Sequence, residues 1–167
     1  MKKVSDIHAI KIIFFITACY VGLWVIRIPT IKDQLQTDYV GVGYIMLSFA
    51  IGSIVAMIFA NALILKTSTK SILTFTLIAE GCLWLPVPFI QELWIFMVFS
   101  FVFGMSYGAF EIACNVYASN LEVREKKSMM SGFHAFWSLG VLFGSLITSF
   151  LLEWNYSFIF NILLYVI

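Results

Sequence analysis

The sequence predicts an all-α protein, a polytopic bundle of membrane-spanning helices. Of its 167 residues, 62% are hydrophobic and only 11% are charged, and the mean hydropathy is +0.99. A soluble domain carries about 45–50% apolar and about 25% charged residues. The apolar residues also fall into segments of about the 20 residues that cross a bilayer. We therefore expect five complete transmembrane helices and a truncated sixth.

Charged residues, glycines and prolines mark the ends of six apolar segments. These are residues 9–28, 41–65, 71–89, 93–120, 132–152 and 154–167. Pro29 is expected to end the first, because proline removes a backbone donor, and Pro86 and Pro88 to close the third. The sixth has about 14 residues where about 20 are needed, so we expect a chain that stops within a helix.

Basic residues predict the orientation of the helices. No small-residue cleavage site follows the first segment, so we expect that segment to remain as a helix. An N-terminus in the cytoplasm leaves only Arg27 and Lys32 outside, as the positive-inside rule requires. The basic residues then on the inside are Lys2, Lys3, Lys11, Lys66, Lys70, Arg124, Lys126 and Lys127.

Several functional classes are disfavoured. Cys19, Cys82 and Cys114 lie in separate apolar segments, which suits neither a disulfide framework nor a metal site. No phosphate-binding loop or paired metal-ligand motif occurs, so ATP-driven transport and zinc catalysis are not expected. We expect no cofactor and no metal. The composition and a net charge of +1 favour the lipid bilayer as partner and not nucleic acid.

Small residues recur on two segments. Ser48, Gly52, Ala56 and Ala60 follow each other at every fourth position, and Gly140 with Gly144 forms a GxxxG pattern. Small residues let the backbones of membrane helices approach closely. The stripes predict helix contacts, which are either static packing or sliding contacts between moving helices.

The fourth segment carries the strongest candidate site. Spacings of three and four place on one face Ser100, Gly104, Gly108, Glu111, Asn115 and Ser119. A carboxylate at membrane depth is costly and is a functional candidate by default. Glu111 is therefore the candidate proton-coupling group, and the amide of Asn115 offers a donor and an acceptor to a polar ligand. Alternatively, the two form a structural pair that bonds a neighbouring helix.

A matching stripe lies on the first segment. Thr17, Tyr20, Trp24 and Arg27 recur at spacings of three and four, which suits a ligand that needs stacking and hydrogen bonds. Tyr20, Trp24 and Arg27 are candidate substrate-binding residues. Arg27 lies near the predicted outer end, so it could instead extend to the interface as an anchor.

Two further positions have less certain roles. His134 and Trp137 share a face at the start of the fifth segment and are candidate gate residues. A histidine at a helix start can equally be an interface or capping residue. Glu80, in the middle of the third segment, has no polar stripe around it, and we assign it no role beyond a structural pairing.

These segments resemble the major facilitator superfamily, and within it the branch of fucose-permease-like proton symporters and related uncharacterised bacterial permeases. The resemblance is carried by Gly108–Asn115 in the fourth segment, Gly22–Pro29 in the first and Ser131–Gly140 in the fifth. It implies an N-terminal half of a secondary transporter in the cell's inner or plasma membrane. It also implies proton-coupled movement of a small polar solute such as a sugar, with the acidic group at Glu111 implicated in coupling.

Two departures from the family pattern stand out. Superfamily members typically have two glycines and an acidic residue between the second and third spans, where this chain has Asn61, Leu65 and Ser68. Lys66 and Lys70 keep only the basic character of that inner loop, which puts the charge-paired gating of the family in doubt. The family also builds its pathway between two six-helix halves, and this chain supplies less than one.

The short length leaves several hypotheses open. The chain is a truncated, inactive remnant, or a half-transporter that pairs with a second copy or a separate second-half chain. A non-transporting membrane scaffold is a further alternative, in which the polar stripes only pack helices. A membrane-embedded enzyme is disfavoured, because no nucleophile, base and third residue converge in the sequence.

Overall fold

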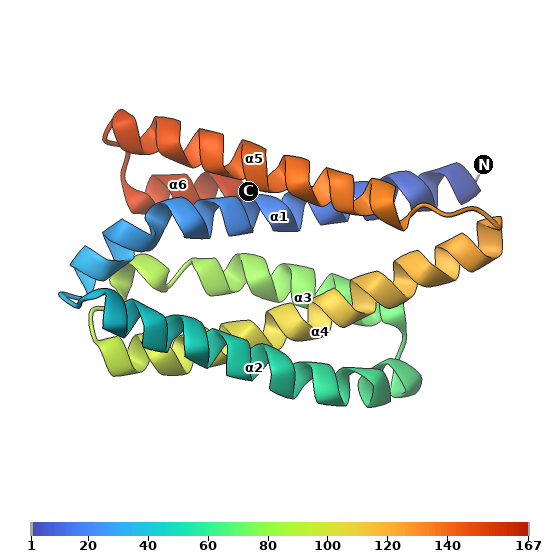
Figure 1. The fold of residues 1–167 in the computed structure, drawn as a ribbon, viewed down its shortest axis with the longest axis horizontal. Helices are drawn as coiled ribbons and strands as arrows, with labels where there is room; N and C mark the ends of the chain where they lie inside the picture. Colours follow the sequence, from blue (N-terminus) through green and yellow to red (C-terminus); the bar gives the residue numbers. More distant parts are fainter. Residues whose placement is uncertain (1, 167) are drawn as a thin grey trace. The chain divides into compact units, whose positions relative to one another are not determined.

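The computed structural model describes residues 2–166, which form a series of helices joined by short connections (Figure 1). The helices are α1 (Lys2–Gln34), α2 (Tyr39–Lys66), α3 (Thr69–Trp84), the 3₁₀ turn η1 (Val87–Phe89), α4 (Leu93–Glu125), α5 (Met130–Glu153) and α6 (Phe158–Val166). Five of them are long and apolar enough to cross a membrane, which confirms the predicted fold class. Residue 167 lies outside the described part, and so do the side chains of residues 2–5 and of Asn61. The expectations placed on these residues also lie outside it.

Some predicted helix ends differ from those in the structure. α1 does not end at Pro29 but continues through it to Gln34. Membrane helices tolerate such an internal proline, because neighbouring groups and local adjustments satisfy the freed carbonyl. α3 itself ends at Trp84 and is followed by the turn η1, but the segment Thr69–Phe89 as a whole is long and apolar enough to cross a membrane, in agreement with the predicted third segment. α6 begins at Phe158 and not at residue 154.

Three of the long helices end in the same way. Gln36 after α1, Lys126 after α4 and Asn155 after α5 adopt positive φ angles of 48°, 52° and 56°. In each case the next N–H bonds back to the carbonyl five residues earlier, as in Thr37 to Lys32. This left-handed turn satisfies carbonyls at the end of a helix and reverses the chain. Each helix therefore stops at a local backbone motif.

The chain divides into two compact units, described here separately. The first contains Met1–Arg27 and Asn115–Asn161, and the second Ile28–Cys114 and Ile162–Ile167. In the first unit, α1 and α5 run side by side (Figure 1). Side chains added at Gly140 and Gly144 would overlap the backbone carbonyls of Phe15 and Cys19 in α1. The expectation that this GxxxG pattern makes a close helix contact is confirmed.

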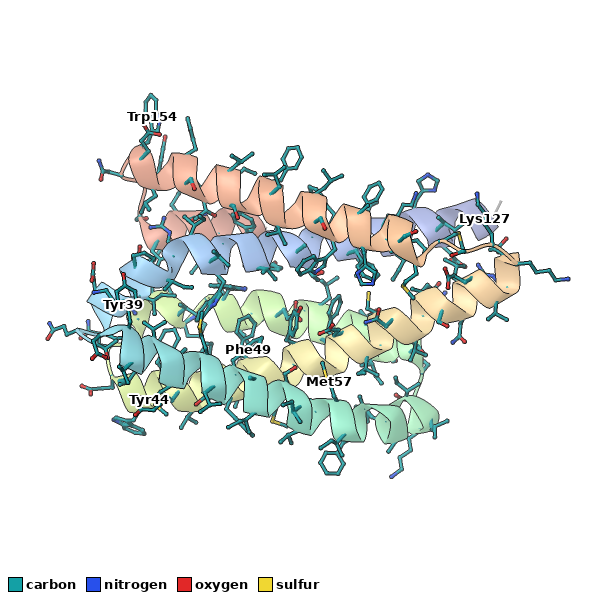
Figure 2. The ribbon with its side chains drawn as sticks, viewed as in Figure 1. Tyr39, Tyr44, Phe49, Met57, Lys127 and Trp154 are labelled. Atoms are coloured by element: carbon teal, nitrogen blue, oxygen red, sulfur yellow. The ribbon has the colours of Figure 1, made fainter. Side chains whose placement is uncertain are left out.

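In the second unit, α2 crosses α4 through glycines on both helices. A Cβ added at Gly52 would overlap the carbonyl of Phe101, and one added at Gly104 would overlap the carbonyl of Phe49. The Phe49 ring, labelled in Figure 2, also packs against the Tyr107 ring at a centroid distance of 5.4 Å. The small-residue stripe on α2 therefore brings the two backbones into contact.

Large apolar side chains cover the outside of the helices. Ile58 of α2 is 68% exposed, Phe75 of α3 73% and Phe150 of α5 55%. Soluble monomers rarely leave contiguous apolar surface of this kind in contact with water. Trp154 projects from the end of α5 (Figure 2) and is 66% exposed, a placement typical of aromatic residues at a membrane interface. The surface suits lipid.

A carboxylate caps the start of α5. The residue at the N-cap position, Met129, provides no side-chain bond. Instead the carboxylate of Glu122, near the end of α4, accepts hydrogen bonds from the N–H groups of Met129 and Met130. A negative charge also interacts favourably with the N-terminal end of a helix dipole. The cap ties together the connection between α4 and α5.

We expect Glu122→Ala to lower the unfolding midpoint of the protein in detergent, because two N–H groups at the start of α5 lose their acceptor. Thermal unfolding followed by circular dichroism measures the change. Glu153→Ala, an exposed carboxyl at the opposite end of the same helix, serves as the control and should leave the midpoint unchanged. Equal midpoints for both variants would contradict the capping role.

Candidate functional site

The predicted polar face of α4 has two parts. Its first three residues, Ser100, Gly104 and Gly108, are buried against α2. The hydroxyl of Ser100 donates to the carbonyl of Ile45 at 3.1 Å, so this part of the face is a helix contact. Further along, Glu111 and Asn115 are half-buried and Ser119 is exposed. Only the second part of the face is open to a ligand.

Two acidic side chains of the second unit, Glu80 of α3 and Glu111 of α4, act on the same neighbours in α4. Both carboxyls act electrostatically on the phenol of Tyr107 and on the thiol of Cys114, two residues of α4. Tyr107, Glu111 and Cys114 follow at spacings of four and three, which places them on one helical face. Glu80, Tyr107, Glu111 and Cys114 all belong to the second unit of the chain.

The stripe on α1 lies in the first unit. Thr17 is buried, and its hydroxyl donates to the carbonyl of Ile13 in its own helix at 2.8 Å. Tyr20 is buried, whereas Trp24 is half-buried. Asn115 belongs to the same unit. The hydroxyl of Thr17 is therefore hydrogen-bonded within its own helix. Tyr20 and Trp24 remain the candidates for contact with a ligand.

Arg27 is held by the start of α6. Its guanidinium Nε donates to Oδ1 of Asn161 at 2.9 Å, and its Nη2 donates to the carbonyl of Tyr156 at 3.5 Å. The guanidinium also lies over the ring of Phe158, with 5.0 Å from its carbon to the ring centroid. Arg27 is only 2% exposed. The guanidinium is therefore enclosed by the residues at the start of α6.

The candidate gate residues lie on the first two turns of α5. His134 is exposed, and its ring meets the edge of the Phe14 ring of α1 at a centroid distance of 5.7 Å. Trp137 is half-buried.

Lys66 ends α2 and Lys70 lies in the first turn of α3, and both are exposed. These placements keep basic side chains on the connection between α2 and α3.

The described part of the chain also has an open groove of about 810 Å³ between α2, α3 and α4. Its lining includes Leu63, Phe75 and Val102 and no charged side chain. None of the predicted site residues lines it. The groove is apolar, like the lipid-facing surface around it.

No group of three or more His, Cys, Asp or Glu within residues 2–166 could hold a metal ion.

Two residues of these sites were missed at the level of sequence. Asn161, fully buried and bonded to Arg27, is the one amide side chain between Phe158 and Val166, and its position in an otherwise apolar and aromatic helix is a signal that could have identified it. Tyr107 precedes Glu111 by one helical turn. This spacing is the signal that could have identified Tyr107 as a neighbour of the candidate carboxyl.

Comparison with known proteins decides the family. A family model described as Major Facilitator Superfamily matches residues 12–167, nearly the whole chain. The chain belongs to this superfamily. Members of the Major Facilitator Superfamily are membrane transporters and not enzymes. No solved structure matches the chain significantly.

Two relatives in the superfamily are themselves uncharacterised. An MFS-type transporter of Yersinia pestis is 28% identical over 143 residues, which cover 85% of this chain and 37% of the relative. A transporter of Sinorhizobium fredii is 23% identical over 141 residues, which cover 79% of this chain and 35% of the relative. The chain thus spans little more than a third of the length of these superfamily members.

Proposed function

We propose that the chain forms part of a secondary transporter that moves a small polar solute, such as a sugar, together with protons. The observation that carries the proposal is the half-buried carboxyl of Glu111 in the membrane-spanning helix α4, which shares its electrostatic neighbours with Glu80. An ionised side chain at the centre of a membrane helix costs about 2.5–3.5 kcal/mol on insertion scales. A group retained at that cost suits proton transfer.

The proposed roles follow from the chemistry of each side chain. Glu111 takes up and releases the proton, and Asn115, one turn further along α4, bonds a hydroxyl of the solute. Tyr20 and Trp24 provide aromatic surface for a sugar ring. Arg27 contributes the charge of its guanidinium, which Asn161 and the carbonyl of Tyr156 hold in place.

Residues at the helix ends have proposed gating roles. His134 and Trp137 line the inner gate, where the contact of His134 with Phe14 links α5 to α1. Lys66 and Lys70 mark the connection between α2 and α3 as cytoplasmic, because basic residues are retained on that side. This orientation places the N-terminus in the cytoplasm of the cell and the helices in its inner membrane.

The superfamily branch and the partner are also proposals. The motifs Gly108–Asn115 and Ser131–Gly140 support the fucose-permease-like branch and its related bacterial permeases. The relatives are more than twice as long as the matched part of this chain, and transport in the family uses two halves. We infer that a second half, of the kind the rest of these relatives provides, completes the pathway.

Replacing Glu111 tests the proton role. We use membrane vesicles from cells that express the protein from its own gene. When a neutral sugar is added outside them, we expect the sugar and protons to enter together. Glu111→Gln should reduce this proton-coupled uptake to background while solute exchange or binding persists, because glutamine keeps the shape but carries no proton. A pH electrode and radiolabelled sugars measure the two processes.

The matched control is Glu153→Gln, which removes an exposed carboxyl at the end of α5 and should leave uptake unchanged. Unchanged proton-coupled uptake in Glu111→Gln would overturn the assignment. Absence of any sugar flux in vesicles that contain the correctly inserted protein together with a second half would favour a scaffold or an inactive remnant over a transporter.

A further inference from the structure

The proposed transport scheme does not use the apolar groove between α2, α3 and α4. All residues that line it belong to the second unit of the chain. The groove is open to the surface and has a volume of about 810 Å³. Its apolar walls offer few hydrogen bonds, so a polar solute would lose its hydration there without compensation. The groove therefore suits an apolar occupant.

The groove follows α3 from its first turn to its last. Ser71 lies in the first turn of this helix and Cys82 in the last, and both line the groove. Between these two residues α3 rises about 17 Å, at about 1.5 Å per residue. One leaflet of a bilayer contributes about 15 Å, half of its hydrocarbon core. The groove thus has the length of one acyl chain of a lipid.

Two lysines flank the end of the groove at the connection between α2 and α3. Lys66 directly precedes Thr67, Lys70 directly precedes Ser71, and both of these hydroxyl residues line the groove. Both lysines are exposed. The sequence has no acidic residue between Tyr39 and Ala79. Positive charge therefore gathers at this end without a carboxylate on α2 or on the first half of α3 to balance it.

We propose that the groove binds an anionic phospholipid, with an acyl chain along α3 and the headgroup phosphate at Lys66 and Lys70. Basic side chains next to a membrane helix attract anionic lipids, with a gain in binding of about fivefold for each lysine. The exposed hydroxyl of Ser71 can donate a hydrogen bond to a phosphate oxygen. Apolar and basic surfaces meet here in the same order as the chain and the headgroup of the lipid. The proposal does not depend on the transported solute or on the role of Glu111.

A protein helix is the competing occupant of the groove. Helices of this unit approach each other through glycines such as Gly52 and Gly104. Another helix in the groove would instead meet the exposed side chains of Phe75, Val102 and Met105. Large side chains keep helix backbones apart, whereas the methylenes of an acyl chain can fill the spaces between them. The walls of the groove therefore favour a lipid over a helix.

Native mass spectrometry tests the binding with protein expressed from its own gene and purified in detergent. Phosphatidylglycerol, phosphatidylcholine with the same acyl chains, and glycerol phosphate are titrated separately. We expect the first phosphatidylglycerol to bind about 10–30-fold more tightly than phosphatidylcholine, the gain from two lysines. Equal affinities for the two lipids would overturn the proposal. So would equally tight binding of glycerol phosphate, because it has the phosphate but no acyl chain.

The double variant Lys66→Gln with Lys70→Gln tests the headgroup site. It should remove the preference for phosphatidylglycerol and leave the binding of phosphatidylcholine unchanged. Lys127→Gln is the matched control, because it removes an exposed lysine on the connection between α4 and α5, and it should keep the preference. A preference that survives in the double variant would place the lipid elsewhere and overturn the site.

Ala79→Leu tests the position of the acyl chain. Ala79 lines the groove, and the larger side chain takes up part of its volume. Binding of both lipids should fall several-fold while the preference for phosphatidylglycerol remains. Ala135→Leu, on an exposed position of α5, is the control and should bind as the unmodified protein does. Unchanged binding in Ala79→Leu, or release of a bound protein and not of lipid by the lysine variants, would overturn the proposal.

Discussion

Replacing Gly104 with alanine should destabilise the protein by about 1–3 kcal/mol, the usual cost of forcing an extra group into a packed contact. The added Cβ would overlap the backbone carbonyl of Phe49, which cannot move aside as a flexible side chain could. The two helices would have to separate, and the hydrogen bond from Ser100 to Ile45 would lengthen. Alanine's higher helix propensity, worth about 0.8–1.0 kcal/mol, offsets only part of this cost.

Unfolding in mixed detergent micelles measures the effect. Cys19 and Cys114 are buried free thiols, so a fluorescent maleimide reports on unfolding as they become accessible, above the baseline from exposed Cys82. The matched control is Gly43→Ala on α2, where nothing lies within 4 Å of the added Cβ. It should leave stability unchanged or raise it slightly. Equal stabilities for the two variants would contradict the packing of α2 on α4.

Asn161→Leu should also cost about 1.5–3 kcal/mol, the range for a hydrogen bond to a charged group. The substitution leaves the guanidinium of Arg27 buried without its amide acceptor, and no carboxylate within the described part of the chain replaces it. Arg27→Leu alone should cost about 1–3 kcal/mol, because it leaves the fully buried amide unpaired. Each single change thus leaves a buried polar side chain without its hydrogen-bond partner.

The double variant Arg27→Leu with Asn161→Leu provides the control, because it removes both polar partners at once. We expect it to be more stable than the sum of the single effects predicts, since replacing a buried polar pair with apolar side chains is often nearly neutral. Equilibrium unfolding of the four proteins completes this cycle. Additive effects would show that the two side chains do not stabilise one another.

Much of the fold was predictable because lipid imposes a simple rule. Each spanning segment must satisfy its backbone internally, so apolar length alone identified five helices to within a few residues at most ends. Among the exceptions, two lie at prolines: α1 passes through Pro29, and α3 ends at Trp84, just before Pro86. Both depend on how the surrounding structure accommodates proline, which local sequence does not determine.

The candidate site was predictable only in part. Glu111 and Asn115 were identified as polar positions on one face of α4, and they remain the proposed proton and substrate residues. The same pattern included Ser100, Gly104 and Gly108, which instead form the contact with α2. A stripe of small and polar residues predicts a face but not what the face meets.

By itself, the sequence determined the membrane character of the chain and the number of its spans, because hydrophobicity and length are local properties. It also identified the glycine stripes that bring the helices together. Only the tertiary structure decided that Arg27 bonds Asn161, 134 residues away, and that the hydroxyl of Ser100 in α4 bonds the carbonyl of Ile45 in α2. These pairings join different helices, and their partners depend on how the helices rotate and cross, which no spacing within one helix encodes.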